Sequence, residues 1–145
     1  MIYTKMTNKA MMVAYNAHHG QVDKCGIPYI FNPIHLAEQM DDEISCTVAL
    51  LHDVVEDTEI TIKDLAKLFP VEVIDAVNLL TRNKETSYYE YIEALKSNKV
   101  AVKVKLADLD HNLDITRMTY EDSLESTKVK ALRSRYKKAK EILTT

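Results

Sequence analysis

A histidine and three acidic residues lie close together near the middle of the 145-residue chain, in the segment LLHDVVEDT. In a continuous helix, Asp53 and Asp57 would share a face at a spacing of four residues, and His52 would lie over Glu56 at the same spacing. Carboxylates are unfavourable near a helix C-terminus, which carries partial negative charge. Because residues 25–62 contain no Lys or Arg, the segment indicates a divalent metal site, with a solvated acidic helix end as the alternative.

A second set of polar residues that could bind a metal occurs later in the chain, in the segment KVKLADLDHNLD. Lys105, Asp108 and Asn112 fall on one face of a predicted helix, and this face borders an apolar stripe. A partly buried aspartate needs a partner. Metal ligation would supply one for Asp108, and an ion pair with Lys105 or Arg117 is the alternative.

The segment GQVDKCGIPYIFNP contains both glycines and two of the three prolines, which predicts a loop. Polar side chains lie in and around this loop: His18, His19, Lys24, Asn32 and His35. A single histidine is more often structural than a ligand, and we interpret His19 and His111 as structural.

Apolar residues recur at helical spacing in four segments: Met6, Ala10, Val13 and Ala17; Ile44, Val48, Leu51 and Val55; Val102, Leu106, Leu109 and Leu113; and Leu132, Tyr136, Ala139 and Leu143. The run at 100–106 alternates like a strand, but its stripe continues to Leu113 and favours a helix. Thr61 and Pro70 bound a short predicted helix, and further helices are predicted after Pro70 and over Thr86–Asn98. These patterns predict a single all-α domain over residues 1–145, with seven or eight helices.

Composition excludes several other classes of protein. The chain is 46% hydrophobic and has no apolar stretch near the ~20 residues that a membrane span requires. The N-terminus lacks the residue order of a signal peptide. Cys25 and Cys46 match no zinc or redox spacing, so we expect reduced thiols in a cytoplasmic protein without a membrane partner.

Charge is distributed unevenly along the chain. The formal net charge of −3 argues against nucleic acid as a partner. Residues 126–140, in contrast, carry seven basic residues and no acid. This tail is interpreted as a solvated helix face, or else as a patch that faces an anionic substrate or another subunit. The tyrosines at 88–91 could belong to the core or to the interface of a possible homo-oligomer.

The three segments, taken in order, resemble the hydrolase domain of the RelA/SpoT family, which breaks down the alarmone (p)ppGpp. This domain belongs to the HD-domain metal phosphohydrolases. The matching stretches are AHHGQVDKCGIPYIFNP, VALLHDVVEDTEITIKDLAKLF and VKLADLDHN. The resemblance implies an HD-domain helical bundle, and the chain length leads us to expect a stand-alone small alarmone hydrolase without synthetase or regulatory domains.

The resemblance also implies an activity, namely a Mn²⁺-dependent guanosine-3′,5′-bis(diphosphate) 3′-pyrophosphohydrolase that acts on a small nucleotide substrate. By this resemblance, His52, Asp53 and Asp108 would be metal ligands. Glu56 and Asp57 would be the catalytic pair that orders and activates the attacking water. Two adjacent acids should not ionise with equal ease, so we expect one of them to have a raised pKa.

For the substrate, the resemblance implies that Lys24 lies near the phosphates and that Asn112 contacts the nucleotide. Lys105 could also neutralise phosphate charge.

Three positions depart from the family pattern. Asn32 stands where the first histidine ligand is expected, and a neutral amide oxygen is a weaker ligand than imidazole, so we expect weaker metal binding. His35 could reach the metal instead. Asp23 replaces a basic residue and Cys25 replaces a small hydroxylated one. These departures leave two alternatives, an HD phosphohydrolase of another nucleotide or phosphoester, and a non-catalytic nucleotide-binding module.

Overall fold

The computed structural model describes residues 1–117 and 126–145, which form nine α-helices and no β-strand. In chain order these are α1 (Lys5–Ala17), α2 (Phe31–Glu38), α3 (Glu43–Leu51), α4 (Val54–Asp57), α5 (Ile62–Ala66), α6 (Val71–Leu80), α7 (Tyr88–Leu95), α8 (Lys99–Leu113) and α9 (Thr127–Thr144), with a 3₁₀ turn at Ile115–Arg117. The predicted all-α fold is confirmed. Within the described residues, no helix is both long and apolar enough to cross a membrane.

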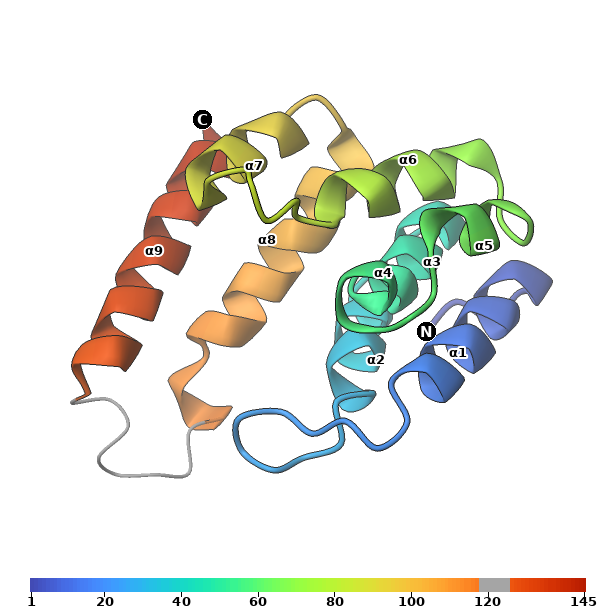
Figure 1. The fold of residues 1–145 in the computed structure, drawn as a ribbon, viewed down its shortest axis with the longest axis horizontal. Helices are drawn as coiled ribbons and strands as arrows, with labels where there is room; N and C mark the ends of the chain where they lie inside the picture. Colours follow the sequence, from blue (N-terminus) through green and yellow to red (C-terminus); the bar gives the residue numbers. More distant parts are fainter. Residues whose placement is uncertain (118–125) are drawn as a thin grey trace.

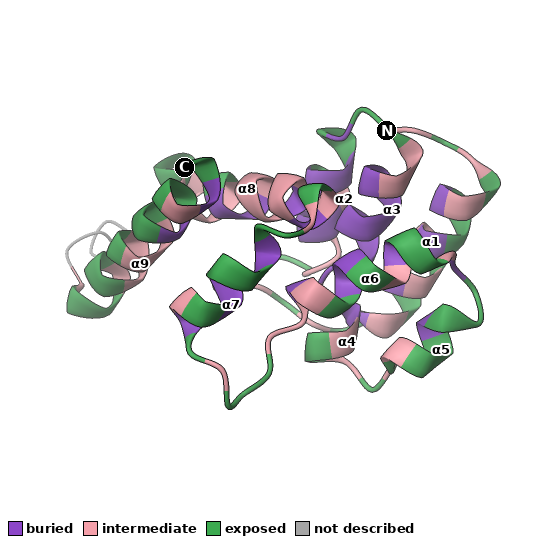
Figure 2. Ribbon diagram, turned by 90° about the horizontal axis from the view of Figure 1, so that it is seen from above, coloured by how far each residue is buried: buried purple, intermediate pink, exposed green. Residues whose placement is uncertain are grey.

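Helix α3 lies at the centre of the fold and packs against α1, α2, α6 and α8 (Figure 1). The Asp42 side chain caps its N-terminus by accepting a hydrogen bond from the Ser45 N–H at 2.7 Å. Every residue from Ser45 to Leu51 is buried, as the purple colouring of α3 in Figure 2 shows. The predicted stripe covered only one side of this helix, whereas the structure buries it on all sides.

The helix predicted through LLHDVVEDT is interrupted in the structure. Helix α3 ends at Leu51, His52 and Asp53 form a turn, and α4 begins at Val54. The assumption of one continuous helix was therefore wrong, and the break accounts for a short additional helix. It also lets the side chains of His52 and Asp53 approach each other, which neighbours on one helix do not do.

Helix α8 covers the segment with strand-like alternation, so the prediction of a helix there is confirmed. Its buried residues are Ala101, Val104, Asp108 and Leu109. Only Leu109 was in the predicted stripe, so the face that points into the core is rotated from the predicted one. Asp108 consequently lies within the buried face and not at its border.

The loop that precedes α2 is also confirmed, and Pro33 lies in the first turn of α2 as expected. Gly20 and Gly26 adopt φ values of +86° and +80°, which favour glycine. Thr61 caps α5 in a capping box with Asp64, and α6 starts directly after Pro70. Cys25 and Cys46 are free thiols.

Helices α8 and α9 run side by side, and α7 packs against both (Figure 1). Ala139 and Leu143 are the buried residues of α9, and Tyr136 is partly buried against the core. In α7, Tyr88 and Tyr91 are buried, so these two tyrosines belong to the interior of the fold.

Candidate metal centre

His52 forms the centre of a buried polar cluster that joins two distant parts of the chain. Its Nδ1 donates to the Ala49 carbonyl oxygen at 2.7 Å, which turns Nε2 toward two carboxylates. Nε2 lies 3.1 Å from Asp53 Oδ2 and 4.0 Å from Asp108 Oδ1. The end of α3 and the buried face of α8 thus bring an imidazole and two aspartates together.

Asp108 is held in place by its own helix. Lys105 Nζ lies 3.2 Å from Asp108 Oδ2, and Asn112 Nδ2 donates to Asp108 Oδ1 at 3.3 Å. The predicted shared face of these three residues is therefore present. The Lys105 ion pair does not exclude ligation, because Oδ1 still faces His52.

The pKa values show how strongly these groups interact. Burial alone would lower the pKa of His52, but Asp53 and Asp108 raise it to about 9. Burial would raise the pKa of Asp53, but His52 and the Tyr29 hydroxyl hold it well below its usual range. Without a metal, the folded protein therefore places a proton on His52 between the carboxylates, where a cation would also be stabilised.

The donor set fits a divalent cation. Asn32 Oδ1 is a buried polar atom without a hydrogen-bond partner within residues 1–117 and 126–145, whereas His52 Nε2 lies 3.1 Å from the Asp53 carboxylate. Buried polar groups are normally hydrogen bonded, and such exceptions occur where an ion or ligand binds. The Nδ1 hydrogen bond of His52 to a backbone carbonyl is also the arrangement that orients a ligating imidazole.

An acidic rim lies next to this cluster. Oxygen atoms of Asp53, Glu56 and Asp57 come within 4.8 Å of one another. Glu56 Oε1 accepts a hydrogen bond from the Arg82 N–H at 2.7 Å. Partial burial, followed by the charges of Asp53 and Glu56, raises the pKa of Asp57 to about 6. The expectation that one acid of the pair has a raised pKa is thus met at Asp57.

Two residues of the cluster were missed from the sequence. The Tyr29 hydroxyl donates to Asp53 Oδ2, and the Tyr29 ring lies 4.9 Å from the fully buried ring of His18. The Gln21 side chain makes two hydrogen bonds: its Oε1 with His18 Nδ1 at 2.9 Å, and its Nε2 to the Asp57 carbonyl oxygen at 3.0 Å. The second bond connects the loop to the acidic rim. Their proximity to LLHDVVEDT depends on the folded loop, so no spacing rule could have identified it.

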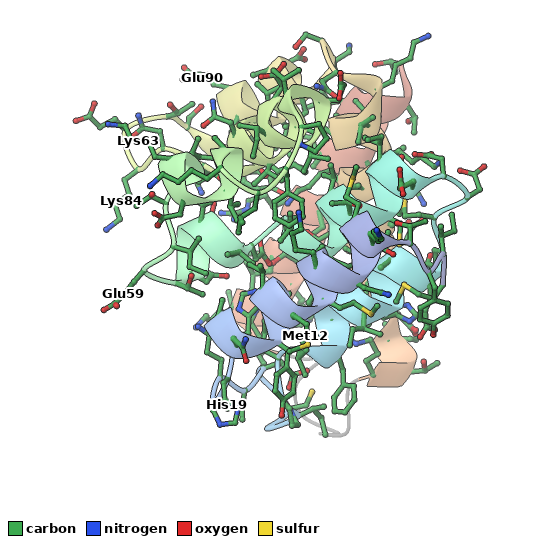
Figure 3. The ribbon with its side chains drawn as sticks, turned by 90° about the vertical axis from the view of Figure 1, so that its right-hand side faces the viewer. Met12, His19, Glu59, Lys63, Lys84 and Glu90 are labelled. Atoms are coloured by element: carbon green, nitrogen blue, oxygen red, sulfur yellow. The ribbon has the colours of Figure 1, made fainter. Side chains whose placement is uncertain are left out.

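The other histidines of the described residues, His19, His35 and His111, make no hydrogen bond with His52. The His35 ring packs against His111 with centroids 4.4 Å apart, beside a cavity of about 420 Å³ that Asn32 also lines. Burial, Arg117 and His35 lower the pKa of His111 to about 4. His19 is exposed and lies at the edge of the molecule in Figure 3.

The loop residues that were expected near substrate differ in their surroundings. Lys24 is exposed and makes no ion pair with the described residues. Asp23 lies 3.6 Å from Arg117 Nη2 and accepts hydrogen bonds from the backbone of Cys25 and Ile27. The charge of Asp23 is thus balanced by Arg117.

The ionisation of His52 predicts the pH dependence of stability for the metal-free protein. Because the pKa of His52 is raised from 6.5 to about 9, its contribution is full below pH 6.5 and is lost as the pH rises through 9. We expect the melting temperature in chelator to fall across this window, and His52→Gln to remove most of the decline. An equal decline in wild type and variant would contradict this interpretation.

Comparisons with known proteins provide an independent view of the chain. No family model matches the sequence. The Escherichia coli K12 bifunctional (p)ppGpp synthase/hydrolase SpoT is 34% identical over 124 residues, covering 75% of this chain and 18% of that protein. A Myxococcus xanthus GTP pyrophosphokinase is 32% identical over 123 residues, covering 72% of this chain and 16% of that protein. This chain therefore spans less than a fifth of the length of these curated relatives.

A solved structure resembles the whole fold. It is a metazoan ortholog of SpoT, described as hydrolysing ppGpp, with a TM-score of 0.80 and 26% sequence identity. The match covers 99% of this chain and 88% of that one. The helical arrangement described above is therefore that of a known hydrolase.

Proposed function

Since this chain belongs to the RelA/SpoT family and has the helical HD-domain fold, we propose that it is a metal-dependent 3′-pyrophosphohydrolase of (p)ppGpp or a closely related nucleotide. The single observation that carries the proposal is the convergence of His52, Asp53 and Asp108 beside the acidic rim. The metal in the proposal is Mn²⁺, held by these three residues with Asn32 as a weaker fourth ligand.

The metal, when bound, would polarise a phosphoryl oxygen and make water more acidic. Asp57 would accept a proton from the attacking water, because a carboxylate with a pKa of about 6 is a stronger base than an ordinary one. Glu56, fixed by the Arg82 N–H, would orient that water. The water oxygen would bond to the phosphorus attached to the 3′ oxygen as the bond between that phosphorus and the 3′ oxygen breaks. The 3′ oxygen would take up a proton, so that the products are pyrophosphate and a nucleotide with a free 3′ hydroxyl.

Lys105 would balance the charge of the bound phosphates from beside Asp108. Asn112 would keep Asp108 oriented while its remaining donor faces the nucleotide, and exposed Lys24 would approach the phosphates from the loop. We place the reaction in the cytoplasm, with no nucleic-acid partner. The cavity beside Asn32, lined by Cys25, His35 and His111, would accommodate other parts of the nucleotide.

Metal removal tests the proposal directly. The acid-lined site should repel an anionic nucleotide when no cation is present, so chelation should abolish binding of ppGpp as well as its turnover. Calorimetry with and without Mn²⁺, together with assays of ppGpp, GTP and other nucleotides, would measure both effects. Undiminished ppGpp affinity after chelation would contradict the scheme, and turnover of another nucleotide alone would favour the alternative substrate.

Asn32→His is expected to raise Mn²⁺ affinity about tenfold or more, because imidazole is a stronger ligand than a neutral amide. Asn32 lines the cavity of about 420 Å³, which offers space for the larger imidazole. Metal titration of both proteins would measure the change, with the turnover rate recorded in parallel. Unchanged affinity would place Asn32 outside the coordination sphere, and tighter metal binding without turnover would favour the non-catalytic alternative.

A further inference from the structure

Two buried polar atoms at the junction of α7 and α9 lack a hydrogen-bond partner within the part of the chain that the structure describes. They are the hydroxyl of Tyr88 and Nε of Arg135. Tyr88 is the first residue of α7 and is 8% exposed. Because a buried hydroxyl without a partner is costly, a bound ion or ligand is one explanation for such a group.

Positive charge is concentrated around this tyrosine. The guanidinium carbon of Arg135 lies 3.9 Å from the centroid of the Tyr88 ring, and that of Arg82 lies 5.6 Å away. Arg135 comes from α9, whereas Arg82 follows α6. Two guanidinium groups from separate parts of the chain therefore lie near the Tyr88 ring, where cation–π attraction stabilises them.

The same location adjoins the metal centre through α8. Lys105 Nζ lies 5.4 Å from the Tyr91 ring, whose centroid is 6.0 Å from that of Tyr88. Burial raises the pKa of Tyr88, while the charges of Lys105 and Arg135 act in the opposite direction, as expected for cations near its hydroxyl. The Lys105 side chain is 14% exposed, and its ion pair with Asp108 uses only part of its donor capacity.

We propose that Tyr88, Lys105 and Arg135 form an oxyanion subsite that binds a second phosphoryl group of the substrate, beside the group held at the metal centre. All three side chains offer N–H or O–H donors and two carry positive charge, which is the chemistry that recognises phosphate oxygens. This inference rests on the proposed function and names the residues that would hold the second phosphorylated position of such a substrate. Arg82 would reinforce the local positive charge.

Tyr88→Phe tests the hydroxyl without removing the ring. In titrations of Mn²⁺-loaded protein with inorganic pyrophosphate, we expect the dissociation constant to rise about tenfold or more, and KM for ppGpp to rise more than kcat falls. The melting temperature of the ligand-free variant should be equal to or above that of wild type, because no internal hydrogen bond is lost.

Tyr91→Phe is the matched control, since the Tyr91 hydroxyl donates to the Leu80 carbonyl oxygen at 2.9 Å. It should lower the melting temperature and leave pyrophosphate affinity unchanged. Arg135→Gln should weaken pyrophosphate binding about tenfold or more, whereas Lys137→Gln, an equal change of charge at an exposed position of α9, should not.

The outcomes separate the subsite from the proposed function. Weakened pyrophosphate binding in Tyr88→Phe and Arg135→Gln supports the subsite even if ppGpp is not hydrolysed. Hydrolysis of ppGpp with wild-type pyrophosphate affinity and KM in both variants overturns the subsite and leaves the proposed function intact. A melting temperature of Tyr88→Phe well below wild type would also overturn it, because the hydroxyl would then have an internal partner.

Discussion

Asp53→Ala is expected to abolish metal retention and to reduce hydrolysis by more than about 100-fold, the upper range for loss of a residue that only supports a ligand. Asp53 links His52, Tyr29 and the acidic residues Glu56 and Asp57. Its carboxylate lies 3.1 Å from His52 Nε2 and accepts a hydrogen bond from the Tyr29 hydroxyl. Its oxygen atoms also lie within 4.8 Å of oxygen atoms of Glu56 and Asp57. Its removal leaves His52 with Asp108 at 4.0 Å as the nearest carboxylate, which is too far for a strong contact.

Elemental analysis of the purified protein and initial rates with Mn²⁺ would measure both losses. Asp110→Ala is the matched control, because Asp110 lies on α8 close to Asp108 but pairs with Lys140 at 2.7 Å on the surface. This control should keep the metal content and rate of wild type. A variant of Asp53 with full metal content and full rate would refute its assignment as a ligand.

Asp57→Asn is expected to lower the hydrolysis rate about 10²- to 10⁴-fold, the usual contribution of a general base. The same substitution should raise the stability of the metal-free protein at pH 7. The pKa of Asp57 is about 6 in the folded protein and 3.8 in the reference state, because burial and Asp53 disfavour its charged form. The fold is therefore weakened when Asp57 ionises, and a neutral isostere removes that penalty.

The sign of this effect defines the pH window to test. A group with a raised pKa in the folded state contributes stability that is present below pH 3.8 and is lost as the pH rises through about 6. Melting temperatures in chelator should therefore fall for wild type between about pH 4 and pH 6, and less so for Asp57→Asn.

Glu59→Gln is the control for this second prediction, because Glu59 is a nearby acid that extends from the edge of the molecule in Figure 3. It should change neither the rate nor the shape of the pH–stability curve. Retention of the wild-type rate in Asp57→Asn would remove Asp57 from the mechanism. A lower melting temperature at pH 7 would show that the carboxylate stabilises the fold.

Local interactions explain what could be predicted from the sequence. Helix periodicity, the cap at Thr61 and the loop with positive-φ glycines all depend on residues a few positions apart, so the pattern alone indicates them. The same holds for the shared face of Lys105, Asp108 and Asn112, whose contacts lie within one helix. The resemblance of three segments to a known family also pointed to the residues proposed as metal ligands, and the structure brings His52, Asp53 and Asp108 together.

The tertiary structure alone decided how these groups meet. His52 at the end of α3 meets Asp108 on α8, 56 positions later in the chain, only because α3 and α8 pack against each other. The contacts of Tyr29 with Asp53, and of Arg135 with Tyr88, likewise join separate elements. Such contacts depend on which face each helix buries, and α8 buries a face that its apolar stripe did not indicate. Local sequence patterns therefore indicated most of the helices and the reactive residue types, whereas the packing of helices against one another set the break after α3 and the geometry of the site.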